Sequence, residues 1–382
     1  MKRRALLGAG CAACALLMAG AARGQSAWQM PARFTRPQTD TDEGGLWAMM
    51  DREETRLRRS PFALRDAKLR AYVQDIACRL AGEHCPDVRV HLVHTPFFNA
   101  SMAPNGMMQV WSGLMLRVDN EAQLAAVLGH EIGHYLARHS VERLRDAKSR
   151  AAFGQVLGLF GLVGAVGQLG VLAGMFAYGQ EHEREADRIG VALMHKAGYD
   201  AAEAAKVWEN LLLEIRARPG GEQASPLFAT HPPAAERQEA LAELAKATPG
   251  GTTNEAAWRD QVARYLPEWL ADEVKRGQHE ESLELLRRLM ARSPGEAAFA
   301  AARGEVYRLR GKEGDAELAL ADYRAALAAG GEPPETHRGI GLLHRARQEA
   351  ALARASFEQY LQKAPQAPDA AMIKSYLEEL PK

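Results

Sequence analysis

One short stretch of this chain carries the residue types of a hydrolytic metal centre, Gly129-His130-Glu131-Ile132-Gly133-His134. Residues four apart share one face of a helix, so His130 and His134 can direct two imidazole rings at one metal ion. Glu131 lies beside them and can act as general base on a water molecule held by the metal. This HExxH pattern predicts zinc-dependent hydrolysis of peptide bonds, with one Zn²⁺ per chain.

A helix has to position these side chains, and the surrounding sequence predicts one. Asn120 followed by Gln123 is typical of a capping box at a helix start. Apolar residues then recur at helical spacing, at Leu124, Val127, Leu128, Ile132 and Leu136. We therefore expect the motif well inside a helix, which favours a metal site over two unrelated histidines on an amphipathic surface.

A second helical stretch offers the third ligand, because a catalytic zinc takes three protein ligands and keeps one position for water. Glu183 completes a His-His-Glu set, and Asp187 lies one turn further on the same face. The Asp187 carboxylate can accept the second ring N–H of a ligating histidine and fix its tautomer. Glu185 competes with Glu183 as ligand, but only Glu183 has Asp187 one turn on.

His139 is a separate case, because one class of metalloproteases takes its third ligand from the pattern HExxHxxGxxH. This chain has Ala137 in place of the glycine, and His139 comes one residue too early for that pattern. On a continuous helix the step from His130 to His139 rotates by about 180°, so His139 is expected to face away. A structural role, or a position at the helix end, is the prediction.

Four motifs occur in the order in which a gluzincin family of metalloproteases has them, a family that also holds HtpX and the CAAX prenyl protease. They are the segment 99–114, LGHEIGHYLARHS from Leu128, EHEREADRIG from Glu181, and FATHPP from Phe228 with Glu236-Arg237 after it. The chain most resembles the BepA-type periplasmic zinc proteases with tetratricopeptide repeats. The resemblance covers roughly residues 45–245. It implies zinc ligands His130, His134 and Glu183, with Glu131 as base.

The resemblance also implies a role for His231. In BepA-type members a histidine at this position can close the open position of the zinc, which would make His231 a gate. Two other roles stay open, a hydrogen-bond donor in the transition state or an ordinary loop histidine. His231 and Arg237 are accordingly expected near the fourth zinc position, as gate or stabiliser.

The start of the chain has the form of a secretory signal peptide, with basic residues at 2–4 before an apolar run over 5–22. Removal of residues 1–24 takes four positive charges from a chain of zero net charge and leaves about −4. That balance argues against a nucleic-acid binder. Cys78 and Cys85 would then be the remaining cysteines, and in an exported chain they predict a disulfide.

The fold class predicted is mainly α, in two domains. An extended tail over 25–42 leads into an α+β protease domain over 43–246, with a small β-sheet beside the HExxH helix. A linker over 247–262 leads into helical repeats over 263–382. Segment 151–180 has no charged side chain. One membrane crossing there would place His130 and Glu183 on opposite sides of the membrane, so we expect a buried core element near the cleft, as a helical hairpin or an irregular segment, with peripheral membrane contact as the alternative.

Residues 263–382 repeat at intervals of about 34 residues and resemble tetratricopeptide repeats, with an ordinary helical bundle as the alternative. The landmark positions are Gly277, Gly314 and Gln348, then Ser282, Ala319 and Ala353 five residues on. Such a stack offers a concave surface for peptides or partner proteins. The family resemblance implies a periplasmic protease that removes misfolded or stalled outer-membrane proteins, brought by the repeats or by the assembly machinery. The alternative is an assembly factor or chaperone whose protease site is largely silenced.

Overall fold

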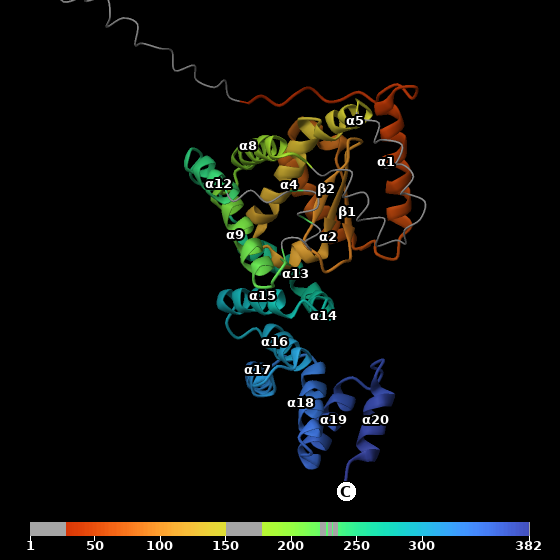
Figure 1. The fold of residues 1–382 in the computed structure, drawn as a ribbon, viewed down its shortest axis with the longest axis vertical. Helices are drawn as coiled ribbons and strands as arrows, with labels where there is room; N and C mark the ends of the chain where they lie inside the picture. Colours follow the sequence, from red (N-terminus) through yellow and green to blue (C-terminus); the bar gives the residue numbers. More distant parts are fainter. Residues whose placement is uncertain (1–27, 150–177, 222–226, 228–230, 232–235, 382) are drawn as a thin grey trace, which may run out of the picture. The chain divides into compact units, whose positions relative to one another are not determined.

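The computed structural model describes residues 28–149, 178–221, 227, 231 and 236–381. Every helix and strand named below lies in one compact unit, Ala32–Lys382. The expected signal peptide and nearly all of the uncharged segment 151–180 lie outside the described residues. The described part is mainly helical with one three-stranded sheet, as predicted (Figure 1). None of its helices combines the length and the apolar composition needed to cross a membrane.

The first half of the described chain holds the sheet and the helices around it. In order these are α1 (Asp42–Arg59), α2 (Ala67–Ala81), the 3-10 helix η1 (Gly82–Asp87), β1 (Arg89–Val93), β2 (Ala100–Met102), β3 (Met107–Trp111), α3 (Ser112–Arg117), α4 (Glu121–Leu136), α5 (His139–Ser149), α8 (Gln180–Lys196), α9 (Ala202–Arg216) and α12 (Arg237–Lys246).

The regular elements of the second half are all helices. These are α13 (Glu255–Val262), the 3-10 helix η3 (Ala263–Tyr265), α14 (Leu266–Lys275), α15 (His279–Arg292), α16 (Ala297–Arg310), α17 (Asp315–Ala329), α18 (Glu335–Ala346), α19 (Ala350–Lys363) and α20 (Ala370–Glu379).

The sheet has the order β1-β3-β2, with β3 in the centre and all five of its residues buried. β1 runs parallel to β3, and Leu92 pairs with Val110. β2 runs antiparallel to β3, and Met102 pairs with Met108. Strand β2 therefore forms one edge, and it contacts α4. The sheet lies beside the HExxH helix, as the sequence predicted.

Helix α1 covers part of the sheet and packs its apolar side chains against it. Leu46, Met49, Met50 and Leu57 join Val93, Met107 and Trp111 in one buried cluster. A polar contact reinforces this packing, because Glu54 of α1 receives hydrogen bonds from Arg89 Nη2 at 2.7 Å and contacts His91 Nε2 at 2.9 Å. Burial alone would raise the pKa of Glu54, but these partners outweigh it and lower the pKa to about 2.

The depressed pKa of Glu54 predicts how stability depends on pH. A carboxyl whose folded pKa lies below its ordinary value of 4.5 stabilises the fold above that pH and loses the contribution as pH falls toward about 2. Urea unfolding of Glu54→Gln should therefore show a smaller loss of free energy between these pH values than the wild type. The exposed Glu209 offers the control, since Glu209→Gln should follow the wild-type curve; equal curves for Glu54→Gln and wild type would contradict the assignment.

The predicted disulfide is present between Cys78 and Cys85. It joins the last turn of α2 to η1, directly before strand β1 begins at Arg89. The bridge closes a loop with a sequence separation of 7 residues. The bridge therefore holds the C-terminal end of α2 next to the sheet that lies beside the HExxH helix.

A buried ion network joins the protease region to the helices that follow it. Arg117 is 4% exposed, and its Nε and Nη2 lie 2.7 Å from Glu214 of α9 and Glu273 of α14, respectively. Arg288 of α15 adds contacts to Glu214 at 2.8 Å and to Asp119. Helices α14 and α15 are thus tied to α3 and α9 by ion pairs, of which those of Arg117 with Glu214 and Glu273 are buried.

The segment predicted as a linker contains helix α13, which packs on the protease region. Trp258 is 1% exposed, and its indole N–H donates to the Val118 carbonyl at 3.2 Å. Its ring also lies beside that of Tyr72. The positions of the domain boundaries stay a prediction.

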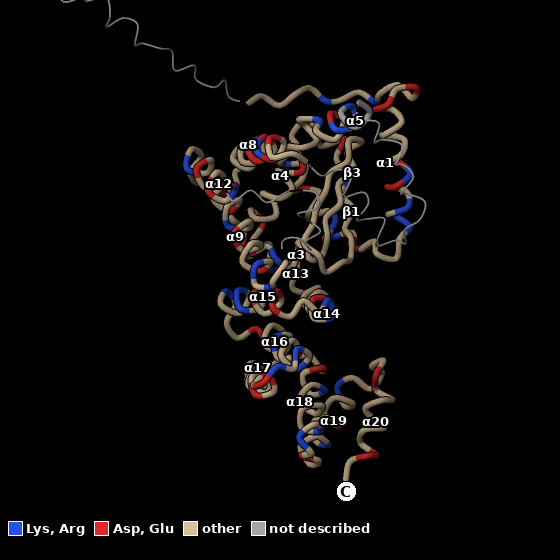
Figure 2. Tube along the Cα trace, viewed as in Figure 1, with Lys and Arg blue, Asp and Glu red and all other residues tan. Residues whose placement is uncertain are grey.

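The repeat landmarks occupy equivalent backbone positions. Gly277, Gly314 and Gln348 have φ values of 70°, 82° and 62°, and each lies one or two residues before the start of a helix, α15, α17 or α19. Five residues on, the three side chains are nearly or fully buried, Ser282, Ala319 and Ala353. Figure 2 shows charges of both signs interspersed along these helices. The helical repeat is regular in structure, and its assignment as a tetratricopeptide repeat stays a prediction.

Candidate active site

Helices α4 and α8 approach each other closely, and two glycines of the HExxH segment permit it. A Cβ atom on Gly129 would lie 3.2 Å from the Gly190 carbonyl oxygen, and one on Gly133 would lie 2.8 Å from the Ala186 carbonyl oxygen. Real Cβ atoms do not come that close to backbone, so only glycine fits at position 133. This contact brings the acidic face of α8 against the two histidines of α4.

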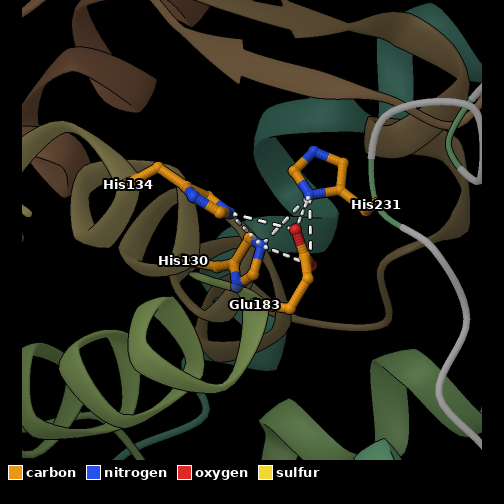
Figure 3. Close-up of side chains that lie close together, drawn as sticks. All are labelled: His130, His134, Glu183 and His231. Atoms are coloured by element: carbon orange, nitrogen blue, oxygen red, sulfur yellow. Dashed lines mark hydrogen bonds and ion pairs between the residues drawn. The ribbon is translucent and has the colours of Figure 1, made fainter. Parts of the chain in front are cut away.

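Three nitrogen and oxygen donors converge where the helices meet (Figure 3). His130 Nε2 lies 3.0 Å from His134 Nε2, and both lie 3.4 Å from the Glu183 carboxylate. Tetrahedral zinc ligands, bound at about 2.0–2.2 Å, lie about 3.3–3.6 Å apart. The three donors therefore match three corners of a zinc site. All three side chains are buried.

The second ring nitrogen of each histidine has its own partner. His130 Nδ1 lies 2.9 Å from Asp187 Oδ1, which is the position that the sequence suggested for Asp187. His134 Nδ1 lies 2.8 Å from His139 Nδ1, and His139 Nε2 lies 3.3 Å from Glu185. When Nδ1 carries the hydrogen, the lone pair of Nε2 points into the site, which is the tautomer that binds a metal.

The contact between His134 and His139 was not foreseen from the sequence. His139 would face away on a continuous helix, whereas α4 ends at Leu136 and Arg138 adopts a left-handed conformation with φ 60°. This turn brings His139 back beside His134 at the start of α5. No glycine or proline marks the turn, so no local signal announced the helix end.

His231 completes a fourth corner around the same point. Its Nδ1 lies 3.3 Å from His130 Nε2 and 3.1 Å from Glu183 Oε1 (Figure 3). Its Nε2 lies 3.4 Å from Glu131 Oε1. His231 is 3% exposed. This ring therefore stands where the water or the substrate carbonyl of a catalytic zinc site would bind.

Arg237 holds the two carboxylates of α8 in place. Its Nε and Nη2 each lie 2.8 Å from one oxygen of Asp187, and its Nη1 lies 2.9 Å from Glu183. Its guanidinium stacks 4.3 Å from the ring of Trp208, a residue of α9 that the sequence analysis did not single out. Arg237 thus contacts the predicted ligand Glu183 directly. It reaches His130 both through Asp187 and directly, because its Nη2 lies 3.0 Å from His130 Nδ1.

Burial and neighbouring charges set the protonation of the site. Burial raises the pKa of Glu131, which suits a group that must accept a proton near neutral pH. Burial alone would also raise the pKa of Glu183, but the contacts with His231, His130 and His134 outweigh it and lower the pKa well below its usual range. Arg237 in the same way lowers the pKa of Asp187 against the effect of burial.

Sequence comparison agrees with this geometry. Residues 63–245 match the sequence model of peptidase family M48. This part of the chain is an M48 peptidase domain. The family consists of metallopeptidases, which confirms the enzyme class predicted from the HExxH pattern and implies a divalent metal ion. The matched range includes the converging side chains of α4 and α8 as well as His231 and Arg237.

The M48 domain is similar to two kinds of characterised protease. The mitochondrial metalloendopeptidase OMA1 of Arabidopsis thaliana is 33% identical over 172 residues, 44% of this chain and 34% of that protein. The beta-barrel assembly-enhancing protease of Escherichia coli K12 is 29% identical over 209 residues, 50% of this chain and 42% of that protein. OMA1 of Saccharomyces cerevisiae is 31% identical over 160 residues, 40% of this chain and 46% of that protein. The matched part of the chain spans less than half the length of each relative, and the predicted similarity to BepA-type proteases is confirmed.

A cavity opens beside the converging donors of the M48 domain. His130, Glu131 and Asp187 lie on its polar side, and its other walls are mainly apolar, with Phe98, Ala100, Val127, Trp208 and Leu241 among them. Ala100 begins the edge strand β2. An extended chain that lies along this edge would thus pass Glu131.

The close packing of α4 on α8 makes a testable prediction. Gly133→Ala should destabilise the fold by about 1–3 kcal/mol, because the added methyl meets the Ala186 backbone, which cannot rotate away. It should also weaken metal binding, since α8 carries Glu183. Gly45→Ala is the matched control, because a Cβ there has no atom within 4 Å, and it should be neutral or stabilising. Urea unfolding and metal titration check both; equal behaviour of the two variants would refute the packing argument.

Proposed function

We propose that this protein is an exported zinc-dependent endopeptidase that hydrolyses misfolded or stalled outer-membrane proteins. The observation that supports the zinc assignment is the donor set itself. Two imidazole nitrogens and a carboxylate lie 3.0–3.4 Å apart, with the remaining ring nitrogens held by Asp187 and His139. Nitrogen and carboxylate ligands in a tetrahedral arrangement are those that catalytic zinc prefers.

The chemistry divides between the ion and the side chains. Zinc bound by His130, His134 and Glu183 would polarise the scissile carbonyl and acidify the attacking water. Glu131 takes the proton of that water and passes it to the leaving amine, a transfer for which its raised pKa is suited. Asp187 keeps His130 in its binding tautomer.

Strand β2 and the apolar cavity indicate how a substrate binds. An edge strand can accept an extended peptide through main-chain hydrogen bonds, which tolerate many sequences. The cavity walls favour an apolar side chain next to the scissile bond. An extended backbone and an exposed apolar side chain are features of unfolded proteins, and this combination supports misfolded chains as substrates.

The cellular setting is supported by similarity and by the expected signal peptide. The relatives from Escherichia coli are named beta-barrel assembly-enhancing proteases, which supports a client class of outer-membrane β-barrels and a periplasmic location. The helical pairs α15 to α20 offer a surface for clients or for the assembly machinery.

A second function is an assembly factor whose protease site is closed for most of the time. The position of His231 favours it, because its Nδ1 lies 3.1–3.3 Å from Glu183 and His130, at the corner that water or substrate needs. In this view His231 is a gate that must leave before hydrolysis begins.

Degradation of unfolded casein tests both functions in one experiment. Zinc-loaded wild type should degrade it, and removal of the metal with a chelator should abolish degradation until zinc is restored. His231→Ala should degrade casein faster than wild type if the histidine is a gate. A His231→Ala variant that retains zinc but is inactive would make His231 catalytic, and degradation that survives complete metal removal would end the zinc proposal.

A further inference from the structure

A second group of metal-binding side chains lies beside the first, on helices α5 and α8. Both helices carry the pattern His-x-x-Glu, as His139 with Glu142 and His182 with Glu185. Residues three apart share a helix face. The two pairs face each other across the helices, because His182 Nε2 lies 3.3 Å from Glu142 and His139 Nε2 lies 3.3 Å from Glu185.

Three of these side chains converge as the ligands of a metal would. His139, Glu142 and His182, the second cluster, each offer a donor atom, and these atoms all lie within 4.8 Å of one another. The two imidazole rings stack with centroids 4.3 Å apart. His182 Nδ1 is buried and has no hydrogen-bond partner among the described residues, so the ion pair with Glu142 leaves this ring incompletely satisfied.

We propose that the second cluster is a further binding site for a divalent transition metal, with zinc as the ion its chemistry fits best. Two imidazoles and one carboxylate form the same donor set as the site of the M48 domain. The side chains of Glu142 and His182 are 53% and 25% exposed, so they can rotate to the shorter separations that a bound ion requires and can be reached from solvent.

The second cluster is connected to the first site by one hydrogen bond. His134 Nδ1 and His139 Nδ1 lie 2.8 Å apart, and only one hydrogen fits between them. A metal on His134 Nε2 needs that hydrogen on His134, whereas a metal on His139 Nε2 needs it on His139. Binding of metal at both sites would require one of the two rings to give up its last ring proton and bind as an imidazolate. A metal in the second cluster therefore weakens metal binding and hydrolysis at the first site without excluding them, a consequence that rests on the proposed zinc role of His134.

Zinc uptake by the full-length chain tests the proposal. Equilibrium dialysis at a Zn²⁺ concentration just sufficient to fill both sites of wild type, followed by metal analysis, should show that His182→Asn and Glu142→Gln each take up one equivalent of Zn²⁺ less than wild type. His195→Asn, an exposed histidine of the same helix, should bind as wild type does. Loss of a residue that only hydrogen-bonds a metal ligand commonly lowers the metal affinity by about 10–100-fold, so loss of a ligand itself should lower the affinity at least about 10-fold. Circular dichroism confirms that each variant is folded.

The outcomes separate this proposal from the proposed function. Equal Zn²⁺ uptake by wild type and the folded His182→Asn and Glu142→Gln variants overturns the proposal of a metal site at the second cluster, whatever the proteolytic activity of these proteins. If wild type takes up a single equivalent, and His182→Asn takes up none, the second cluster stands and the catalytic zinc site fails. If both sites hold, excess Zn²⁺ should inhibit casein degradation by wild type at concentrations that leave His182→Asn active; equal inhibition of both would overturn the antagonism.

Discussion

Glu131→Gln should lower the rate of peptide hydrolysis by about 10²–10⁴-fold while the protein keeps its metal and its stability. The carboxylate is 3% exposed, and burial raises its pKa, so it can both accept and release a proton. Glutamine has the same shape and cannot accept that proton. Glu131 is absent from the three converging donors, so zinc content should not change.

A matched control variant and two measurements test this prediction. Glu181→Gln alters an exposed carboxylate in the first turn of α8 and should leave the rate unchanged. Casein degradation gives the rate, and metal analysis gives the zinc content. A Glu131→Gln variant that retains more than about a tenth of the activity would require another base. If assembly of outer-membrane proteins survives in the inactive variant, the protein's main function is assembly rather than hydrolysis.

Arg117→Met should destabilise the protein by about 3–5 kcal/mol, the largest effect expected for a residue outside the active site. Arg117 is the cation between Glu214 and Glu273, both buried, at 2.7 Å from each. Methionine fills much of the volume but leaves two carboxylates in a region without water. Because the network joins α3 to α9 and α14, the contact between the protease region and the helices after it should weaken first.

Two further variants test whether the cost comes from unpaired charge. Arg345→Met removes an exposed cation that pairs with Glu379 at 2.8 Å, and it should cost less than about 1 kcal/mol. The triple variant Arg117→Met, Glu214→Gln and Glu273→Gln should recover part of the loss, because no charge is then left without its main partner. Urea unfolding measures all three. A loss below about 1 kcal/mol for Arg117→Met would show that Arg288 and Arg276 suffice to neutralise the carboxylates.

The sequence by itself was enough for features that depend on local spacing. The four-residue step from His130 to His134 and the four-residue step from Glu183 to Asp187 each place two side chains on one helix face, and the structure has both arrangements. The alternation of apolar and polar residues predicted the small sheet beside the helix. The even number of cysteines left in an exported chain predicted the Cys78–Cys85 bridge, and the repeat of about 34 residues predicted the helices of the second half.

Tertiary structure decided which local features meet. His139 reaches His134 because α4 ends at a left-handed Arg138, a conformation that favours glycine and that nothing in the local sequence announced. His182 and Glu142 lie far apart in the chain, and Arg117 meets Glu214 and Glu273 from three different elements. Short-range periodicity specifies helices and the faces they present, whereas contacts between distant segments depend on the packing of whole elements, here made close by Gly129 and Gly133.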